Sequence, residues 1–321
     1  MNKLTVVIIN YRTADMVIDC LKTLLPELDG ISSRVVIVDN LSQDGSYERI
    51  KSWVSGNDDS SRIELMASGS NSGFSGGNNS GIKCEKSEYY LLLNSDTLIR
   101  KMAVKKLLNV ASKTPDVGLI TPRLEWENGL PQESCFLFHS PISEFISVAQ
   151  TGFITRLLSK YNVPLSVVSK PRNPDWSSFA CVLIRKEVFD DVGLMDDGYF
   201  MYFEDAEFCH RARKAGWKVL NEPSAHVVHL RGGSSPVKEN TKLKKRLPRY
   251  YYESRTRFFY QTYGWLGLTL ANILWSAGRI ISKTRQILGR SDKAISEKQW
   301  LDIWTNWLNP LKSYVHPENY K

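Results

Sequence analysis

The stretch TVVIINYRTADMVIDCLKTLLPELDGISSRVVIVDN, residues 5–40, determines the fold, because it has the pattern of a strand, a helix and a second strand. Its two apolar runs, Thr5–Ile9 and Val35–Val38, contain no alternating polar side chains. Such runs are typical of parallel strands that are covered on both faces. Between them, apolar residues recur at helical spacing over Asp15–Leu28, and Gly30 can end that helix. The order predicts a βαβ unit of a nucleotide-binding α/β fold.

The alternation continues beyond this unit. A third apolar run covers Tyr89–Leu93, and further candidate elements lie at Gly118–Pro122, Ser178–Arg185 and the amphipathic stretch Glu204–Ala215. We therefore expect an α/β domain with a mainly parallel central sheet over residues 1–235. Beyond about residue 235 the chain becomes basic, then aromatic and then apolar, which predicts a helical C-terminal extension over 236–321.

The extension has two features that suit a membrane surface. Eight cations lie between Lys238 and Arg257, and each cation near an anionic surface adds about 1 kcal/mol; a solvated helix face is the alternative. The following segment, Phe258–Ile281, is apolar apart from a few residues and is borderline in length for a spanning helix. We expect a helix or helical pair in the membrane interface, with Trp265 and Trp275 at headgroup depth. A buried core helix is the alternative.

Composition narrows the class of protein. With 42% hydrophobic and 24% charged residues, the chain is neither disordered nor fibrous. Its five scattered cysteines have no metal-ligand spacing, so we expect reduced thiols in a reducing compartment. The apolar N-terminus fits a first strand better than a secretory signal. The net charge of +8 comes with no nucleic-acid-binding motif, and we expect no nucleic-acid partner.

A polar cluster follows each of the three apolar runs. These clusters are Asn10–Thr13, Asp39–Asn40 and Asn94–Thr97. Ligands of open α/β sheets bind at the carboxyl ends of strands, so three clusters at one edge predict a site there. Helix capping is the alternative for any one of them.

The segment Gly69–Asn79 is rich in glycine and asparagine but matches neither GxGxxG nor GxxxxGK[ST]. Its glycines would let the backbone approach a ligand closely, and Asn78 and Asn79 would open the next helix. A plain surface loop is the alternative.

Metal and acid–base candidates lie further along the chain. Asp96 is an oxygen ligand suited to Mg²⁺ or Mn²⁺, and His229 is a second candidate ligand. His226 and His229 are three residues apart and would face opposite sides of a strand, so we expect only one of them in the site. Glu204 and Asp205 follow an aromatic run, where a carboxylate can have its pKa raised and act as a general base. Helix capping is again the alternative.

The ordered set VVIINYRT, VVIVDNLSQDGS, NSGFSGGNNSGI, YYLLLNSDT, GYFMYFEDAEFCHRARKAGWKV and HVVHLRGGS resembles family 2 glycosyltransferases, in particular the bacterial rhamnosyltransferase-like branch. The resemblance implies a GT-A fold and inversion at the anomeric carbon by direct displacement. It implies that Asp39 recognises the pyrimidine base, that Asp96 and His229 hold the metal, and that Asp205 is the base, supported by Glu204.

Two departures from the family pattern affect the expected site. The usual DxD signature appears as Asn94-Ser95-Asp96, a form common in the rhamnosyltransferase-like branch. Phe179 occupies a place where the family usually has glycine, so its ring could reshape an acceptor pocket near Trp176. We expect the remaining nucleotide contacts to come from Asn10, Tyr11, Asn40, Gly73, Asn78 and Ser95.

The expected reaction is transfer of rhamnose from dTDP-rhamnose to a glycan or a polyprenyl-diphosphate-linked acceptor, in bacterial O-antigen or capsule biosynthesis. A UDP-hexose, UDP-hexosamine or UDP-galactofuranose donor stays open, as does a catalytically silent scaffold that binds a nucleotide-sugar. We expect a cytoplasmic protein attached peripherally to the anionic inner face of the cell membrane.

Overall fold

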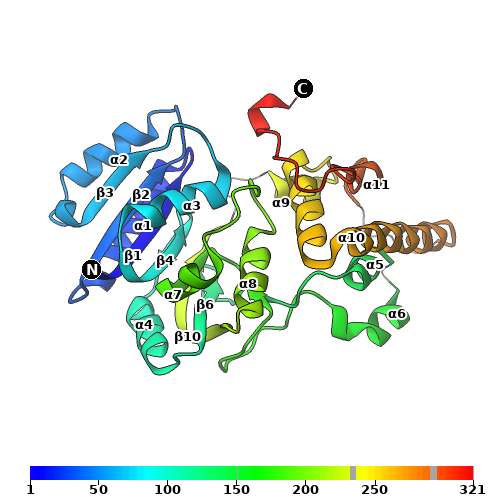
Figure 1. Cartoon of the computed structure of the whole chain (residues 1–321), viewed down its shortest axis with the longest axis horizontal. Helices are drawn as coiled ribbons and strands as arrows, with labels where there is room; N and C mark the ends of the chain where they lie inside the picture. The colour runs from blue at the N-terminus through cyan, green and yellow to red at the C-terminus, as the bar shows by residue number, and fades with distance from the viewer. Residues whose placement is uncertain (150, 232–235, 290–294, 321) are drawn as a thin grey trace. The chain divides into compact units, whose positions relative to one another are not determined.

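The computed structural model describes residues 1–149, 151–231, 236–289 and 295–320 (Figure 1). Contacts divide the chain into two compact units. The first consists of Met1–Cys135, Ser166–Asp197 and Phe208–Ser234, and the second of Phe136–Leu165, Gly198–Glu207 and Ser235–Lys321. Neither unit is one continuous stretch, because 136–165 and 198–207 group with the C-terminal residues.

The first unit is built on a large sheet with the strand order β3-β2-β1-β4-β9-β6-β10-β5. Neighbouring strands from β3 to β4 are parallel, as are β6 and β10, whereas β9 and β5 run antiparallel to their neighbours. The expected α/β fold with a mainly parallel sheet is therefore confirmed. The strands are β1 Asn2–Asn10, β2 Ser33–Asp39, β3 Ile63–Ala67, β4 Ser87–Asn94, β5 Thr97–Ile99, β6 Val117–Glu125, β9 Cys181–Arg185 and β10 Lys218–His229; β7 Cys135–Phe136 and β8 Trp176–Ser177 form a separate pair.

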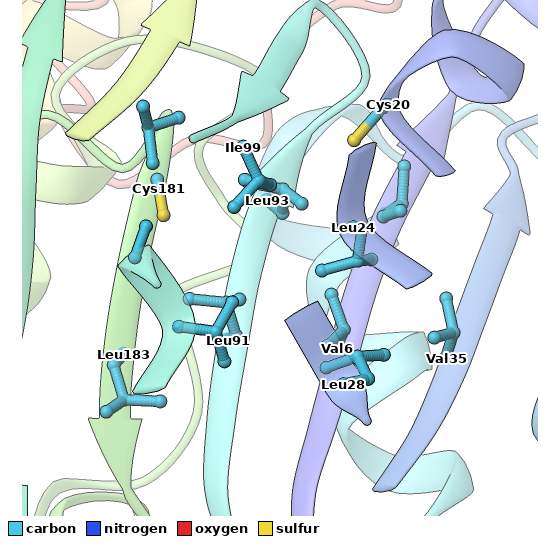
Figure 2. Close-up of a cluster of buried hydrophobic side chains, with 14 of the residues drawn as sticks. Val6, Cys20, Leu24, Leu28, Val35, Leu91, Leu93, Ile99, Cys181 and Leu183 are labelled. Atoms are coloured by element: carbon cyan, nitrogen blue, oxygen red, sulfur yellow. The ribbon is translucent and has the colours of Figure 1, made fainter. Parts of the chain in front are cut away.

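Helices cover this sheet, and one apolar core lies between α1 and the strands. Figure 2 shows side chains of this core, among them Val6 of β1, Leu91 of β4 and Leu24 of α1, all fully buried. The helices of this part are α1 Ala14–Leu24, α2 Ser46–Ser55, α3 Gly73–Cys84, α4 Ala103–Lys113 and α7 Lys186–Val192, and the boundary between the units falls within α8 Glu204–Lys214.

The sequence predicted the first helix over Asp15–Leu28, but α1 ends at Leu24. A 3₁₀ turn, Leu25–Leu28, follows it and has Pro26 in its first turn. Proline has no N–H for the next helical hydrogen bond, so the α-helix stops before it.

The second unit is helical. It contains α5 Pro141–Ala149, α6 Gly152–Leu157, α9 Val237–Leu243, α10 Arg249–Ile287 and α11 Gln299–Asp302. A non-helical residue, Gly264 with φ +67° and ψ −170°, divides α10 into two helical halves, as expected of a helical pair. No described helix of the chain is both long and apolar enough to cross a membrane.

One expectation about this unit is wrong, and so is one of the alternatives. Trp275 is only 2% exposed and lies in the apolar core of the unit with Val148 and Tyr252, so it cannot lie at headgroup depth; Trp265, by contrast, is 41% exposed. The basic cluster is not a uniform solvated face either, because ion pairs within the unit use three of its cations. These pairs are Arg246–Asp302, Arg249–Glu253 and Arg255–Glu144. The side chain of Lys238 lies outside what the structure describes.

Candidate active site

The carboxyl ends of β1, β2 and β4 coincide, as the polar clusters predicted. Asn10 is paired with Asp39 in the register of β1 and β2, and Ile9 is paired with Asn94 in that of β1 and β4. The hydroxyls of Thr13 and Ser95 are 3.1 Å apart and connect the clusters that follow β1 and β4. Tyr11 is half-buried, and the Arg12 guanidinium lies 5.0 Å from the centre of its ring.

Asp39 is fixed at this edge by three hydrogen bonds. Its Oδ2 accepts from Asn10 Nδ2 at 2.6 Å and from Ser42 Oγ at 2.7 Å, and its Oδ1 accepts from the Ser42 N–H at 3.0 Å. Asn10 and Asp39 are both buried. A carboxylate offers roughly four acceptor positions, so about one remains for a ligand donor.

Asn40 connects the end of β2 to the glycine-rich segment. Its Nδ2 donates to Asn71 Oδ1 and to the Gly73 carbonyl oxygen, both at 3.0 Å, and its Oδ1 accepts from the Ser72 N–H at 3.2 Å. Gly73 begins α3 with φ +68°, a conformation that glycine adopts without strain. The side chain of Asn40 therefore shapes the start of α3.

One glycine of the segment Gly69–Asn79 acts differently from what the sequence suggested, and Gly81, which lies beyond that segment, acts in the same way. A Cβ on Gly77 would lie 3.0 Å from Ile9, and one on Gly81 would lie 2.4 Å from Val7. These glycines let α3 approach β1 rather than a ligand. Asn78 and Asn79 do not open the helix, which begins at Gly73. Asn78 Nδ2 donates to the Phe74 carbonyl at 3.0 Å, and the Asn79 side chain exchanges two hydrogen bonds with the backbone of Met195.

The expected metal ligands lie together. His229 Nε2, at the end of β10, lies 3.4 Å from Asp96 Oδ1, and each side chain is 11% exposed. His226 Nδ1 instead lies 3.1 Å from Glu125 Oε2, which confirms that the two histidines diverge. His229 Nδ1 has no hydrogen-bond partner among the described atoms. Within the described ranges, no cluster of three or more His, Cys, Asp or Glu residues could hold a metal ion, and Asp96 and His229 form a pair.

Gln132 and Arg231 adjoin this pair, and the sequence did not indicate them. Gln132 Nε2 donates to the His229 carbonyl at 2.7 Å, and the guanidinium of Arg231 donates to Gln132 Oε1 and, at 3.0 Å, to the Glu133 carbonyl. Burial lowers the pKa of Arg231, whereas the charges of Glu133 and Asp96 oppose this effect. Arg231 thus adds positive charge near Asp96. Its place directly before Gly232-Gly233-Ser234 was the available signal, but these three residues lie outside the described part.

The candidate acid–base residues belong to the second unit. Glu204 is 7% exposed, and its Oε2 has no partner in the part of the chain that is described. Burial, and after it the charge of Asp205, raises the pKa of Glu204 well above its usual range. Asp205 is half-buried, and its Oδ1 accepts from the Ala206 N–H at 2.8 Å. Glu204 is thus a buried carboxyl group with a raised pKa. Its neighbour Asp205 bonds the first turn of α8.

The expected acceptor residues differ in exposure. Trp176 is half-buried in β8. Phe179 is 2% exposed, and its ring packs edge-on against Phe208 with centroids 5.9 Å apart. Its ring belongs to the apolar interior, so any effect of Phe179 on an acceptor pocket would act through the side chains that it packs against.

Comparisons with known proteins relate this chain to glycosyltransferases. The family described as Glycosyl transferase family 2 matches residues 5–193. The low-salt glycan biosynthesis hexosyltransferase Agl10 of Haloferax volcanii is 28% identical over 263 residues, which are 80% of this chain and 75% of that protein. An N-acetylglucosaminyl-diphospho-decaprenol L-rhamnosyltransferase of Mycobacterium tuberculosis is 29% identical over 150 residues, covering 46% of this chain and 48% of that protein. The dTDP-rhamnosyl transferase RfbF of Shigella flexneri is 26% identical over 255 residues and covers 74% of each.

A solved structure shares the fold at low sequence identity. The mannosyltransferase PcManGT from Pyrobaculum calidifontis, in complex with GDP-Man and Mn²⁺, has a TM-score of 0.53 and 13% identity, and the match covers 97% of this chain and 85% of that one. The likeness supports the GT-A fold. The residues matched by the family include Asp39 at the end of β2 and Asp96 in the turn between β4 and β5. Because the family match extends over more than half of the sequence, this chain belongs to glycosyltransferase family 2.

Proposed function

We propose that the chain transfers rhamnose from dTDP-rhamnose to a glycan or polyprenyl-diphosphate-linked acceptor in cell-surface polysaccharide assembly. The observation that carries the proposal is the gathering of Asp39 and the Asp96–His229 pair at one sheet edge of a family 2 glycosyltransferase. The names of two relatives, a dTDP-rhamnosyl transferase and a rhamnosyltransferase acting on a diphospho-decaprenol acceptor, support the donor and the acceptor class. The hexosyltransferase relative keeps a UDP-hexose, UDP-hexosamine or UDP-galactofuranose donor as the alternative.

In this proposal the sheet edge binds the nucleotide diphosphate. Asp39 accepts a hydrogen bond from the pyrimidine base through its remaining acceptor position, while Asn10 and Ser42 keep the carboxylate in place. Tyr11, Asn40, Gly73, Asn78 and Ser95 are proposed to complete the nucleotide contacts, Asn40 and Asn78 by shaping α3.

Asp96 and His229 fit a divalent ion, Mn²⁺ or Mg²⁺. Two ligands of one ion lie about 3 to 3.5 Å apart when each bond is about 2.1 Å, and Asp96 Oδ1 and His229 Nε2 are 3.4 Å apart. Such ions are commonly held by one or two protein groups together with substrate phosphates. When bound, the ion neutralises negative charge on the leaving diphosphate. Arg231 contributes further positive charge near Asp96.

Asp205 is proposed as the general base. As the acceptor oxygen forms its bond to the anomeric carbon, the bond from that carbon to the diphosphate breaks, and the acceptor proton passes to Asp205. Attack opposite to the leaving group inverts the anomeric centre, which is typical of family 2. Burial raises the pKa of Glu204 and so favours its neutral form beside Asp205.

The second half of α10 is proposed to dock on a membrane surface. Apolar side chains spaced three, four or seven residues apart form an exposed stripe; they are Leu266, Leu270, Ile273, Ile280 and Ile287, with exposed fractions from 41% to 85%. An exposed apolar stripe on one helix face is typical of interfacial helices. The exposed Lys242, Lys244 and Lys245 supply positive charge for anionic lipids.

Calorimetric titration with dTDP, UDP, GDP and CDP, each with and without Mn²⁺, tests the proposed site. We expect dTDP to bind and Mn²⁺ to strengthen that binding. In an activity assay, we expect the chain to transfer rhamnose from dTDP-rhamnose to a short-chain lipid-diphospho-N-acetylglucosamine. Preference for UDP would favour the alternative donors. Binding of a nucleotide-sugar without transfer to any acceptor would favour the silent scaffold.

A further inference from the structure

The backbone just before Glu204 is in an unfavourable conformation. Tyr202 and Phe203 have φ angles of +73° and +67°, in the left-handed region that aromatic residues rarely adopt. Each such residue costs on the order of 1–3 kcal/mol. Two in succession persist only when the surrounding structure holds them in place, and such strain clusters at functional sites.

The first half of α10 supplies much of what holds this turn. Ser254 Oγ donates to the Met201 carbonyl oxygen at 3.0 Å. The ring of Tyr202 stacks on that of Tyr250 with centroids 6.4 Å apart and meets the ring of Tyr251 edge-on at 5.6 Å. The turn is therefore bonded through its backbone and packed through its first aromatic ring.

The second aromatic ring of the turn is enclosed. Phe203 is 8% exposed, and its ring centroid lies 5.7 Å from that of Tyr251, 5.5 Å from that of Phe258 and 5.0 Å from that of His139. Burial lowers the pKa of His139 to about 4, so at neutral pH it is an uncharged member of this aromatic cluster.

A buried ion pair fixes α10 itself next to the turn. Arg255 is 3% exposed and adjoins Ser254 in sequence. It donates to Glu144 Oε2 of α5 at 2.7 and 3.1 Å, and to Asn272 Oδ1, beyond the kink, at 2.7 Å. The three groups connect α5 with both halves of α10, so Ser254 is presented from a rigid helix.

We propose that Ser254, Tyr251 and His139 are positioning residues, which hold the strained turn at Met201–Phe203 and thereby orient the carboxylate of Asp205 towards the acceptor hydroxyl. The inference rests on the proposed role of Asp205. Tyr251 and Ser254 lie outside the residues matched by the family, 5–193, and the turn precedes Asp205 by a single residue. The C-terminal extension thus contributes to the geometry of the reaction as well as to any membrane docking.

Ser254→Ala tests the inference, with Thr256→Ala as the matched control. Thr256, two residues further along α10, also donates to a backbone carbonyl, that of Thr305 at 2.8 Å, and is also buried. Using dTDP-rhamnose and the short-chain lipid-diphospho-N-acetylglucosamine, we expect Ser254→Ala to lower kcat about 10- to 100-fold, with the donor KM and dTDP affinity unchanged. Thr256→Ala should retain a kcat within about twofold of the parent.

Relief of the strain should reverse the defect. Glycine adopts a positive φ at no steric cost, so Tyr202→Gly in the Ser254→Ala background should recover at least part of the lost kcat. A general loss of stability would not be repaired by a second substitution that also removes an aromatic contact. Wild-type kcat in Ser254→Ala, or equal losses in Ser254→Ala and Thr256→Ala, would overturn the inference.

A second measurement does not depend on activity. Burial raises the pKa of Glu204, so the Tm of the parent should fall between pH 5 and pH 8. If Ser254 holds the turn, its loss should expose the Glu204 carboxyl to water. The fall in Tm should then be smaller in Ser254→Ala, and it should be unchanged in Thr256→Ala. If the parent shows no transfer, the proposed reaction is wrong. The comparison of Tm between pH 5 and pH 8 still decides whether Ser254 holds the turn. An unchanged pH dependence in Ser254→Ala refutes the holding role.

Discussion

At the scale of single residues, Glu204 and Asp205 show how two adjacent carboxyl groups can differ. Glu204 is buried with an unpartnered oxygen among the described atoms, whereas Asp205 is half-buried and bonds the Ala206 N–H. Burial favours the neutral form of a carboxyl group. The charge of Asp205 adds to this effect, because a second negative charge beside it would be unfavourable.

Glu204→Gln should raise stability at high pH. Burial raises the pKa of Glu204 in the folded chain above its unfolded value of about 4.3. The contribution of Glu204 to the free energy of unfolding is therefore fully present below the pKa of the unfolded chain. It is lost as the pH rises through the pKa of the folded chain. Glutamine mimics the neutral form, so Tm measured by calorimetry should rise by a few degrees at pH 8 and change little at pH 4. A gain of equal size at both pH values would show that ionisation of Glu204 is not the cause.

Asp205→Asn should abolish transfer and spare nucleotide binding. Removal of a general base costs about 10² to 10⁴ in rate, so kcat should fall at least about 100-fold while the calorimetric affinity for dTDP stays within about twofold. Because Asn can still accept from the Ala206 N–H, this hydrogen bond within the first turn of α8 is kept. Parallel loss of binding and transfer would mean that Asp205 is structural.

His229→Ala should remove the effect of metal on nucleotide binding, with His226→Ala as the control. The two histidines lie on the same strand, but only His229 lies beside Asp96, whereas His226 lies beside Glu125. We expect the increase in dTDP affinity caused by Mn²⁺ to disappear in His229→Ala and to persist in His226→Ala. Metal dependence that survives in His229→Ala would exclude this residue as a ligand.

The sequence predicted the residues at the sheet edge because strand ends can be located from apolar runs. Asp39 directly follows such a run, and Asp96 comes three residues after the end of another. The three-residue spacing of the histidines separated His229 from His226. The sequence could not predict that Phe179 is buried or that Gln132 contacts His229. Those contacts join segments far apart in the chain, and no local pattern encodes such pairings.

At the scale of elements, α3 packs closely against β1 because of its glycines. Gly81→Ala would place a Cβ 2.4 Å from Val7 Cγ1, and overpacking of this kind costs about 1–3 kcal/mol, more than the roughly 1 kcal/mol that alanine gains in a helix. We expect Tm to fall by several degrees.

The matched control for this prediction is Gly56→Ala at the end of α2. A Cβ there would meet nothing closer than 3.8 Å, and Gly56 has φ −91°. Its Tm should stay within about a degree of the parent. A similar fall in both variants would mean that close packing of α3 on β1 does not account for the effect.

Elements with long apolar runs were predictable, and those without them were not. The runs at 5–9, 35–38 and 89–93 became β1, β2 and β4. β3 and β5 were missed, because Ile63–Ala67 includes Glu64 and Thr97–Ile99 is three residues long. In α10, the apolar composition could not distinguish the buried Trp275 from the exposed Ile273, since this depends on which helix face packs inside the unit.

At the scale of the whole molecule, the sequence described the composition of the C-terminal extension better than its contacts. The basic cluster looked like one cationic surface, yet the guanidinium of Arg255 is buried against Glu144 and Asn272. A charge run shows how many cations are present but not which of them have partners. Fewer unpaired cations are exposed than the eight that the sequence contains between Lys238 and Arg257. The apolar stripe of α10 is therefore proposed to contribute more to membrane affinity than the cations do.

The stripe can be tested with Ile273→Glu combined with Ile280→Glu. These side chains are 51% and 67% exposed, so their replacement should leave Tm nearly unchanged. Each isoleucine that enters the acyl boundary contributes on the order of 1 kcal/mol or more. Flotation with vesicles rich in phosphatidylglycerol should therefore show at least about tenfold weaker binding of the double variant, and binding of the parent should weaken with salt because of the exposed lysines.

Leu130→Glu is the control for the membrane prediction, because Leu130 is 60% exposed in the other unit and far from α10 in sequence. It should bind vesicles like the parent, since it adds the same kind of charge without touching the stripe. A parent chain that fails to float at low salt would refute membrane docking. Sedimentation of the parent and the double variant tests another role for the stripe. If the parent forms a concentration-dependent dimer that the double variant lacks, the stripe is a contact between copies of this chain. Burial against a second stripe would remove the same apolar area from water.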